Sequence, residues 1–527
     1  MSEDTEASDS DDGEIFHRLL ARRASLTPDK PLLLLGDASL TYRDVELQSN
    51  RYAHGLARQG VTKGNRVLVM IPSGVDHILL WLALCKLGAL MVPVNDAYMG
   101  NLLRHQANDS GAKLAIVWSH HLERWQALSG ELPSLKSIAV YPEITDQTSA
   151  DAPWELVATS SLYSDDDKPL TTTVSASDPM AIFYTSGTTG PSKGVLYSYR
   201  QAYVTAQVPA EWIDENDVFY MTLPMFHVGL SQMVGLVLIA GATMAIREKF
   251  SVSFFWDDVR RYGATATILL STMPNFLLSA PAGATDRDHS LRKAIVIPLP
   301  ANLEGFKQRF GVEVYTFYNM TEVSVPLRSD HQRLANGTSC GRPRPGVDAR
   351  IVDALDEPVP AGSSGELVLR SDRAWEFSLG YWRNSEKTAE SRTNLWFHTG
   401  DVFRCDEEGN FYFVDRLKDA IRRRGENISS YEVEAEIETH PAVLESAAVA
   451  VPSDDGEDEI KAIIALRDGV SLTAEDLYGY LSNRLPKYML PLFIEIHESE
   501  LPKTPTGKIL KQQLRSAGTA TASRMRG

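Results

Sequence analysis

The sequence is poor in cysteine and has no long basic tract. Its 527 residues include three cysteines, Cys85, Cys340 and Cys405, none with CxxC spacing. This scarcity excludes a disulfide framework and is typical of a reducing compartment, so we expect a cytoplasmic protein. The formal net charge is −17, and no basic tract indicates a nucleic-acid partner. The acidic N-terminus also lacks the basic start and apolar run of a signal peptide.

Uncharged runs are short, with one exception. Val218–Ile246 contains no Asp, Glu, Lys or Arg and is long enough to span a bilayer. Pro224, His227 and several glycines interrupt it. We therefore predict a strand, a turn and a buried helix here, and no membrane span.

The remaining composition is that of an ordinary globular protein, with 43% apolar and 23% charged residues. A chain of this length predicts two or more domains. The first 14 residues carry seven acids and no base, which predicts a disordered acidic tail over 1–14. We place the boundary between a large domain (15–415) and a small one (419–515) at Asp415–Lys418, and predict a flexible tail over 516–527.

Apolar, strand-like runs alternate with amphipathic segments in the large domain. Met180–Tyr184 is predicted as a buried strand, and Ala301–Phe310 as a helix closed by Gly311. Val312–Phe317 then forms a strand that delivers Tyr318–Glu322 at its carboxyl end. Such alternation indicates parallel α/β sheets, whose ligands bind beyond the carboxyl ends of the strands.

The pattern changes after about Asp348. Strands are predicted at 351–353 and 366–370, and a hairpin over 402–414 turns at Gly409 and Asn410. From Asp419 onward the sequence predicts a small α+β unit with helices near Tyr431–His440 and Thr473–Arg484.

The strongest chemical signal is the run Tyr184–Gly194, YTSGTTGPSKG. Glycines allow the backbone to approach an anion, hydroxyls donate to phosphate oxygens, and Lys193 supplies positive charge. The run does not match a Walker A loop, which argues against a P-loop phosphotransferase. The alternative is a flexible surface loop of small residues.

This run resembles the phosphate-binding signature of the adenylate-forming superfamily, which includes acyl-CoA synthetases, peptide-synthetase adenylation domains and firefly luciferase. Further motifs follow in the family's order over roughly Leu40 to Leu514: Leu223–His227, Tyr318–Glu322, Gly380–Trp382, His398–Asp401, Asp415–Asp419, Arg424–Ile428 and Thr506–Lys508. The resemblance implies an α/β fold with a large N-terminal domain of mixed and parallel sheets with helices, plus a distorted β-barrel part. It also implies a small, mobile α+β C-terminal domain.

The resemblance implies a role for each motif in ATP binding. Tyr318 stacks on adenine, Thr321 contacts the α-phosphate, Glu322 holds Mg²⁺, and Asp401 and Arg416 bind the ribose or phosphates. Taken alone, a Thr-Glu pair is more often a helix N-terminus and a single Asp a turn residue. The implied ATP/AMP-binding set is Thr185, Ser186, Gly187, Thr188, Thr189, Gly190, Lys193, Tyr318, Asn319, Met320, Thr321, Asp401 and Arg416.

A second set of residues is implied for catalysis and for coenzyme A. Lys508 reaches the site during adenylation and bridges the acyl carboxylate and ATP. A fixed cation there offsets the repulsion between these two anions. Rotation at the hinge, 416–418, centred on Lys418, then exchanges Lys508 for the loop at Gly425 and Glu426, beside the pantetheine tunnel. Arg422, Arg423 and Arg424 are candidates for binding the phosphates of CoA. For each of them, the alternative is a place on a solvated basic strand.

The acyl pocket is implied at His227, Val228 and Ile295–Ile297. For His227, a core histidine is the alternative. Ile295, Val296 and Ile297 stand where the family commonly has Gly-Gly-Ala, and we expect their bulk to narrow the pocket. These residues, with 419–428, resemble the carnitine/crotonobetaine-CoA ligase-like branch. Asn319 also departs from the family's usual small residue and is expected to hydrogen-bond near the adenine.

These observations predict an ATP-dependent acyl-CoA ligase of the AMP-forming acid–thiol class. Its catalytic residues are Lys508, Thr321, Glu322 and His227, and its partners are ATP, Mg²⁺, coenzyme A and a small carboxylic acid. The alternatives are an inactive acyl-AMP or nucleotide-binding module, an adenylation enzyme that loads a carrier protein, and a luciferase-like oxygenase. The sequence names neither the acid nor the oligomeric state, for which a homodimer stays open.

Overall fold

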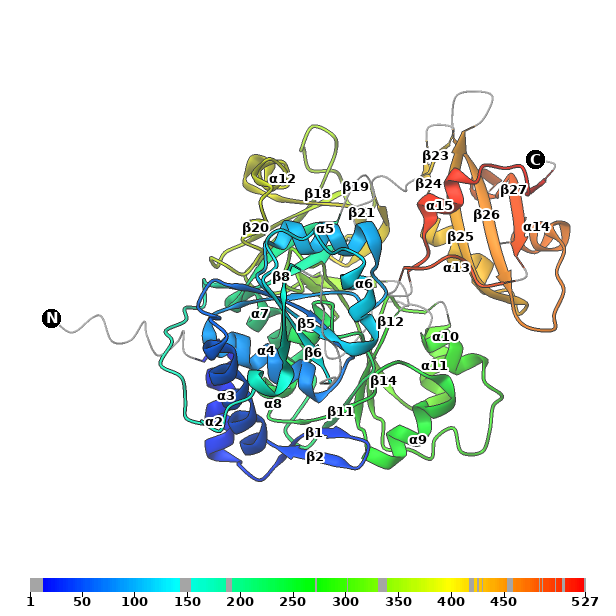
Figure 1. Cartoon of the computed structure of the whole chain (residues 1–527). Helices are drawn as coiled ribbons and strands as arrows, with labels where there is room; N and C mark the ends of the chain where they lie inside the picture. The colour runs from blue at the N-terminus through cyan, green and yellow to red at the C-terminus, as the bar shows by residue number, and fades with distance from the viewer. Residues whose placement is uncertain are drawn as a thin grey trace.

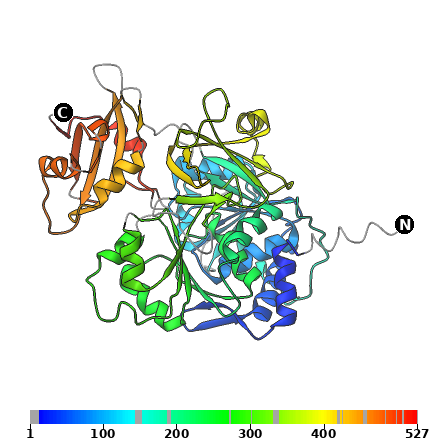
Figure 2. The same ribbon diagram turned by 180° about the vertical axis from the view of Figure 1, so that it is seen from behind.

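The computed structural model describes residues 13–142, 153–185, 192–270, 273–300, 302–329, 339–416, 421–423, 426–428, 430–452, 458–482, 484–485, 487–497, 499–504 and 508–525, apart from the side chains of residues 416, 422, 423, 426, 427, 432 and 488. Three sheets make up the large N-terminal part, and a fourth lies in a separate C-terminal unit (Figures 1 and 2).

The first sheet has eight strands in the order β20-β9-β8-β4-β3-β5-β6-β7. The run from β8 to β7 is parallel, whereas β9 and β20 add antiparallel at one edge. The strands are β3 (Arg66–Met70), β4 (Leu90–Pro93), β5 (Leu114–Trp118), β6 (Ser137–Tyr141), β7 (Glu155–Ala158), β8 (Pro179–Thr185), β9 (Lys193–Ser198) and β20 (Gly380–Tyr381).

The second sheet has seven strands in the order β14-β13-β12-β10-β11-β1-β2, all parallel except β2. Its parallel strands end at one edge, where binding residues were predicted. The strands are β1 (Pro31–Leu35), β2 (Ala38–Thr41), β10 (Val218–Met221), β11 (Thr243–Ile246), β12 (Ala266–Leu270), β13 (Lys293–Ile297) and β14 (Glu313–Tyr315).

Helices pack on these two sheets: α2 (Phe16–Leu26), α3 (Tyr42–Arg58), α4 (Val75–Leu87), α5 (Gly100–Ser110), α6 (Leu122–Gln126), α7 (Tyr199–Ala210), α8 (Gly229–Ala240), α9 (Val252–Tyr262), α10 (Met273–Ser279) and α11 (Leu303–Phe310). Both α4 and α8 are apolar around most of their circumference, as helices buried on all sides are. The uncharged stretch Val218–Ile246 is therefore strand β10, buried helix α8 and strand β11, as predicted. None of the described helices has the length and apolar character needed to cross a bilayer.

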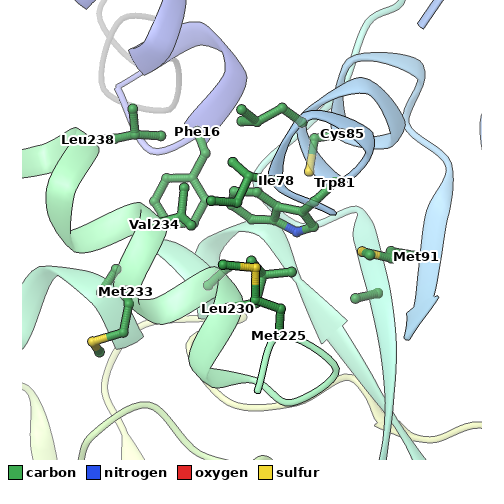
Figure 3. Packing of buried hydrophobic residues seen from close by; sticks show 14 of the residues in the cluster. Phe16, Ile78, Trp81, Cys85, Met91, Met225, Leu230, Met233, Val234 and Leu238 are labelled. Carbon is green, nitrogen blue, oxygen red and sulfur yellow. The ribbon is translucent and has the colours of Figure 1, made fainter. Parts of the chain in front are cut away.

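One large apolar core joins α2, α4 and α8 to both sheets (Figure 3). Phe16 of α2 lies against Trp81 of α4, with ring centroids 5.6 Å apart. It fits there because Gly235 of α8 has no side chain: a Cβ at that position would lie 2.3 Å from Phe16 Cζ. The N-terminal helix is thus part of the core.

The third sheet is antiparallel, in the order β15-β16-β17-β22-β21-β19-β18, and corresponds to the part predicted as a distorted barrel. Short helix α12 (Ser385–Glu390) lies beside it. The strands are β15 (Phe317–Tyr318), β16 (Leu327–Arg328), β17 (Ser339–Pro343), β18 (Val347–Val352), β19 (Ser364–Ser371), β21 (Phe397–Cys405) and β22 (Phe411–Arg416). The predicted hairpin with its turn at Gly409 and Asn410 is the β21–β22 pair.

The C-terminal unit is the predicted small α+β domain, with its own apolar cores. Its sheet has the order β25-β26-β27-β28, and β23 and β24 form a separate hairpin. The elements are β23 (Ile421–Arg423), β24 (Glu426–Ile428), α13 (Ser430–Glu438), β25 (Val443–Pro452), β26 (Asp458–Leu466), α14 (Ala474–Ser482), β27 (Phe493–His497), α15 (Lys511–Ser516) and β28 (Ser523–Arg524).

Parts of both predicted tails contact the folded body. Residues 1–12 lie outside the described part, but Glu14 is buried and pairs with Arg200 and Arg373. At the other end, Ser523–Arg524 pairs with β27 and Met525 is buried. These short segments of low apolar content find their partners, two arginines and strand β27, in the folded body.

Candidate active site

The glycine-rich loop connects two neighbouring antiparallel strands. β8 ends at Thr185 and β9 begins at Lys193, and these two residues face each other across the pair. The intervening Ser186, Gly187, Thr188, Thr189 and Gly190 lie outside the described residues. The structure therefore places both ends of the predicted phosphate loop at the edge of the first sheet.

Tyr318 and Asp401 are brought together from distant parts of the chain. The Tyr318 hydroxyl donates to Asp401 Oδ2 at 2.7 Å, and both side chains are buried. The Tyr318 ring also meets Phe403 edge-on, with centroids 4.9 Å apart. Arg416 lies opposite Asp401 in the β21–β22 pair. The predicted adenine- and ribose-binding residues thus share one corner of the third sheet.

The segment between Tyr318 and Val325 is held by two side-chain contacts to the backbone. Asn319 Oδ1 accepts from the Val325 amide at 2.9 Å, which supports the positive φ of 44° at Val325. The buried Gln201 amide donates to the Thr321 carbonyl oxygen at 2.9 Å. Asn319, a departure from the family pattern, therefore stabilises this turn. Met320, between Asn319 and Thr321 in the sequence, is half-buried against the core of the third sheet.

Glu322 is buried, and its Oε1 accepts from the Tyr381 hydroxyl at 2.9 Å. Burial is the main cause that raises the pKa of Tyr381, and the Glu322 charge adds to it, so the phenol stays a donor. Among the described residues, no three His, Cys, Asp or Glu side chains form an all-protein metal site. Magnesium that travels with a nucleotide needs only one or two carboxylates beside the phosphates, and Glu322 fits that use.

Glu366 holds the strand that carries Asp401, a role that the sequence did not reveal. Its two carboxylate oxygens contact the Gly400 amide at 2.8 Å and His398 Nδ1 at 3.0 Å. The Thr399 hydroxyl donates to the Leu367 carbonyl oxygen and accepts from the Asp401 amide. The conformation of His398–Asp401 is therefore fixed from β19, the neighbouring strand.

His227 follows β10 at the carboxyl edge of the second sheet, and the neighbouring Val228 is buried. The His227 side chain is accessible to solvent, yet enough protein surrounds it that desolvation lowers its pKa to about 4. The positive charge of Lys508 is the smaller of the two causes of this lowered pKa. The role of Lys508 in adenylation stays a prediction.

The three branched residues of β13 do not all face the same way. Ile295 and Ile297 pack with the core between the two parallel sheets, whereas Val296 packs with the core under α9 and α11. This alternation follows from the pleat of a strand. Ile295 and Ile297 thus share the core that holds Val228, the residue after His227, and Ile297 is the more exposed of the two.

The predicted coenzyme A residues lie in and beside the β23–β24 hairpin. Arg422 pairs with Asn427 and Arg423 with Glu426 in its backbone register. Lys418, Arg424 and Gly425 lie outside the described residues. Near the hinge, Asp415 Oδ2 accepts from the Ser430 amide at 2.9 Å, and the Tyr431 hydroxyl donates to the Leu299 carbonyl oxygen at 3.3 Å.

Comparison with known proteins places this chain in a family. The family model described as AMP-binding enzyme matches residues 20–382, and the AMP-binding enzyme C-terminal domain matches residues 432–508. The chain belongs to the AMP-binding enzyme family.

Individual proteins agree with this assignment. A crotonobetaine/carnitine–CoA ligase of Salmonella paratyphi A is 32% identical over 90% of this chain and 93% of its own length. The crystal structure of an anthranilate CoA ligase with anthranoyl-AMP matches at a TM-score of 0.86, with 25% identity over 95% of this chain and 96% of that one. The crystal structure of ATP-bound MatB from Rhodopseudomonas palustris matches at a TM-score of 0.82, with 25% identity over 95% of this chain and 98% of that one.

Proposed function

We propose that this protein is an ATP-dependent, AMP-forming acyl-CoA ligase. It joins a carboxylic acid to ATP, giving acyl-adenylate and pyrophosphate, and then transfers the acyl group to coenzyme A with release of AMP. The observation that carries the proposal is that the Tyr318–Glu322 segment contacts Asp401 through Tyr318 and, through Glu322 and Tyr381, approaches Lys193 at the end of the glycine-rich loop.

The nucleotide is held by residues of the first and third sheets. Tyr318 offers a flat ring to adenine, and the Asp401 carboxylate accepts from the ribose hydroxyls. Thr185 and Lys193, at the two ends of the loop, face the phosphates. Glu322 holds Mg²⁺, which neutralises phosphate charge when it is bound. Arg416 adds a contact to the ribose or phosphates.

In the first half-reaction, an oxygen of the acid's carboxylate forms a bond to the α-phosphorus of ATP, and the bond to pyrophosphate breaks. A carboxylate is ionised near neutral pH, so no protein base is required. Lys508 supplies the cation that brings two anions together and offsets the charge that develops at phosphorus. Thr321 donates to the α-phosphate.

In the second half-reaction, the sulfur of coenzyme A attacks the acyl carbon and AMP leaves. The C-terminal unit turns at Lys418, so that Lys508 withdraws and the Gly425 loop enters beside the thiol. Arg422, Arg423 and Arg424 approach the phosphates of coenzyme A. His227 lies between the acyl pocket and the thiol.

The acid that the protein activates is short. The protein acts in the cytoplasm. Ile295 and Ile297 pack into the core that also holds Val228, the residue after His227, and we expect their bulk to favour acids of eight or fewer carbons. A relative at 32% identity is named for crotonobetaine and carnitine, so betaine-type acids belong in the substrate panel beside branched and aromatic ones.

Product analysis tests the proposal. With a panel of short acids, ATP and coenzyme A, we expect AMP, pyrophosphate and acyl-CoA in equal amounts. ADP as the nucleotide product contradicts the mechanism. Acyl-AMP that forms but is not passed to coenzyme A favours a carrier-loading enzyme, and nucleotide binding without pyrophosphate release favours an inactive binding module.

A further inference from the structure

Tyr381 lies between the glycine-rich loop and the Tyr318–Glu322 segment. Strand β20 pairs antiparallel with β9, with Tyr381 opposite Val195, and the next amide, of Trp382, donates to the Gly194 carbonyl oxygen at 2.7 Å. The Tyr381 amide donates to Thr388 Oγ1 at 2.9 Å. The backbone of Tyr381 is therefore fixed two residues from Lys193 in the sheet register.

The Tyr381 side chain contacts both groups that would face the phosphates. Its hydroxyl donates to Glu322 Oε1 at 2.9 Å, and the Lys193 ammonium lies 5.9 Å from the centroid of its ring. The Ser378 amide, on the same segment, donates to the Glu322 carbonyl oxygen at 2.8 Å. One side chain thus connects the candidate metal ligand with the lysine at the loop's end.

We infer that Tyr381 is a positioning residue for the metal–triphosphate part of ATP. Its hydroxyl fixes the Glu322 carboxylate toward the metal, and its ring keeps the Lys193 ammonium near the phosphates through a cation–π contact. A carboxylate already held in place loses less rotamer freedom on binding, and that saving appears as affinity. This inference rests on the proposed function, because it assumes that Mg·ATP is the ligand.

Two substitutions separate the two contacts. Tyr381→Phe removes the hydroxyl and keeps the ring, whereas Tyr381→Leu removes both. Calorimetric titration of the full chain with ATP, in excess magnesium and in EDTA, reads binding without catalysis. We expect Tyr381→Phe to weaken Mg·ATP binding by about tenfold or more, since hydrogen bonds to charged groups have this strength, and to leave ATP binding in EDTA unchanged. Tyr381→Leu weakens binding in both conditions.

Tyr220→Phe is the matched control. Tyr220 is a buried tyrosine whose hydroxyl donates to a carboxylate, Asp258 Oδ2, at 2.6 Å, under helix α9. The substitution removes the same kind of hydrogen bond, from a tyrosine hydroxyl to a carboxylate. We expect it to leave Mg·ATP binding at the wild-type value. Tyr220→Phe should also convert synthetic acyl-AMP and coenzyme A at the wild-type rate.

Three results overturn the inference: Tyr381→Phe binds Mg·ATP as tightly as wild type, it loses affinity equally with and without magnesium, or the wild-type chain does not discriminate between the two conditions. Failure of the proposed function is a separate outcome. A wild-type chain that binds Mg·ATP and makes no acyl-CoA contradicts the activity, while the calorimetric comparison still decides the role of Tyr381.

Discussion

The lowered pKa of His227 predicts that its imidazole is neutral near pH 7. Desolvation and then the Lys508 charge lower its pKa from 6.5 to about 4, so the neutral form dominates above that value. If His227 takes part in thioester formation as proposed, we expect the neutral ring to act by shape and hydrogen bonding, without a titration near pH 6.5.

This state predicts a pH profile. His227→Phe should lower the rate of thioester formation and leave the shape of the profile between pH 5.5 and 8 unchanged, because the wild-type ring does not titrate there. The measurement is kcat/KM against pH for both proteins. An acidic limb near pH 6.5 that is present in wild type and lost in the variant would show that the histidine is protonated during turnover.

At this scale the sequence predicted some site residues and missed others. Tyr318 and Asp401 could be predicted because each lies in a short motif with its own spacing. The sequence does not single out Glu366, and it gives Tyr381 no role beyond its place in the motif Gly380–Trp382. Their partners, His398 and Glu322, lie 32 and 59 residues away. Such long-range side-chain pairs are set by the packing of the sheets, and a single sequence without its fold does not encode them locally.

At the scale of elements, β13 shows how strand geometry refines a sequence-based expectation. The three branched residues were expected to narrow the pocket together. The pleat of the strand turns Val296 to the opposite core, so Ile295 and Ile297 alone remain in the core that includes Val228, part of the proposed acyl pocket. Whether a residue points to one face or the other follows from its register, which only the sheet fixes.

Ile297→Ala should therefore widen the range of acids. Relief of an overfilled site is worth about 1–3 kcal/mol, so we expect kcat/KM for a twelve-carbon acid to rise about tenfold relative to a four-carbon acid. Val296→Ala is the control: it removes similar bulk from the other core and should lower thermal stability without a change in chain-length preference. An equal shift in preference for both variants would rule out the assignment.

Helix α2 is the second element whose packing leads to a prediction. Phe16 is buried between Trp81 and the space left by Gly235 (Figure 3). Phe16→Ala should lower the free energy of unfolding by about 3–5 kcal/mol, as removal of a large buried ring commonly does. Urea unfolding measures the loss. Phe254→Ala, at a ring that is 54% exposed, should cost far less, and equal losses would argue that α2 packs differently.

At the scale of the whole molecule, the described arrangement brings the C-terminal unit against the large domain. Asp415 and Leu299 of the large domain accept from Ser430 and Tyr431 at the start of α13, and the charge of Lys508 acts on His227. If the proposed turn at Lys418 takes place, we expect these contacts to change with it.

Two substitutions should separate the half-reactions. Lys508→Ala removes the cation needed for adenylation, and loss of such a contact costs about 2.7–4 kcal/mol, roughly 10²–10³ in rate. The same variant should convert synthetic acyl-AMP with coenzyme A at near the wild-type rate. Gly425→Leu should behave in the opposite way, because an added side chain obstructs the thiol's path.

Single-turnover kinetics are the suitable measurement, since product release cannot mask chemistry. Lys487→Ala, at an exposed lysine of the same unit, controls for loss of a surface charge and should leave both half-reactions intact. If Lys508→Ala and Gly425→Leu lose both half-reactions equally while folded, the two-orientation mechanism does not hold.

The order of the parts along the chain matters while the protein is being made. The residues proposed to hold the nucleotide lie at or before Arg416 in the sequence, and Lys508 is synthesised well after them. Domains tend to fold as they emerge, so under the proposed mechanism a nascent large domain binds ATP before it has the cation needed to consume it. A translation product that ends before residue 508 would therefore bind ATP without forming acyl-adenylate.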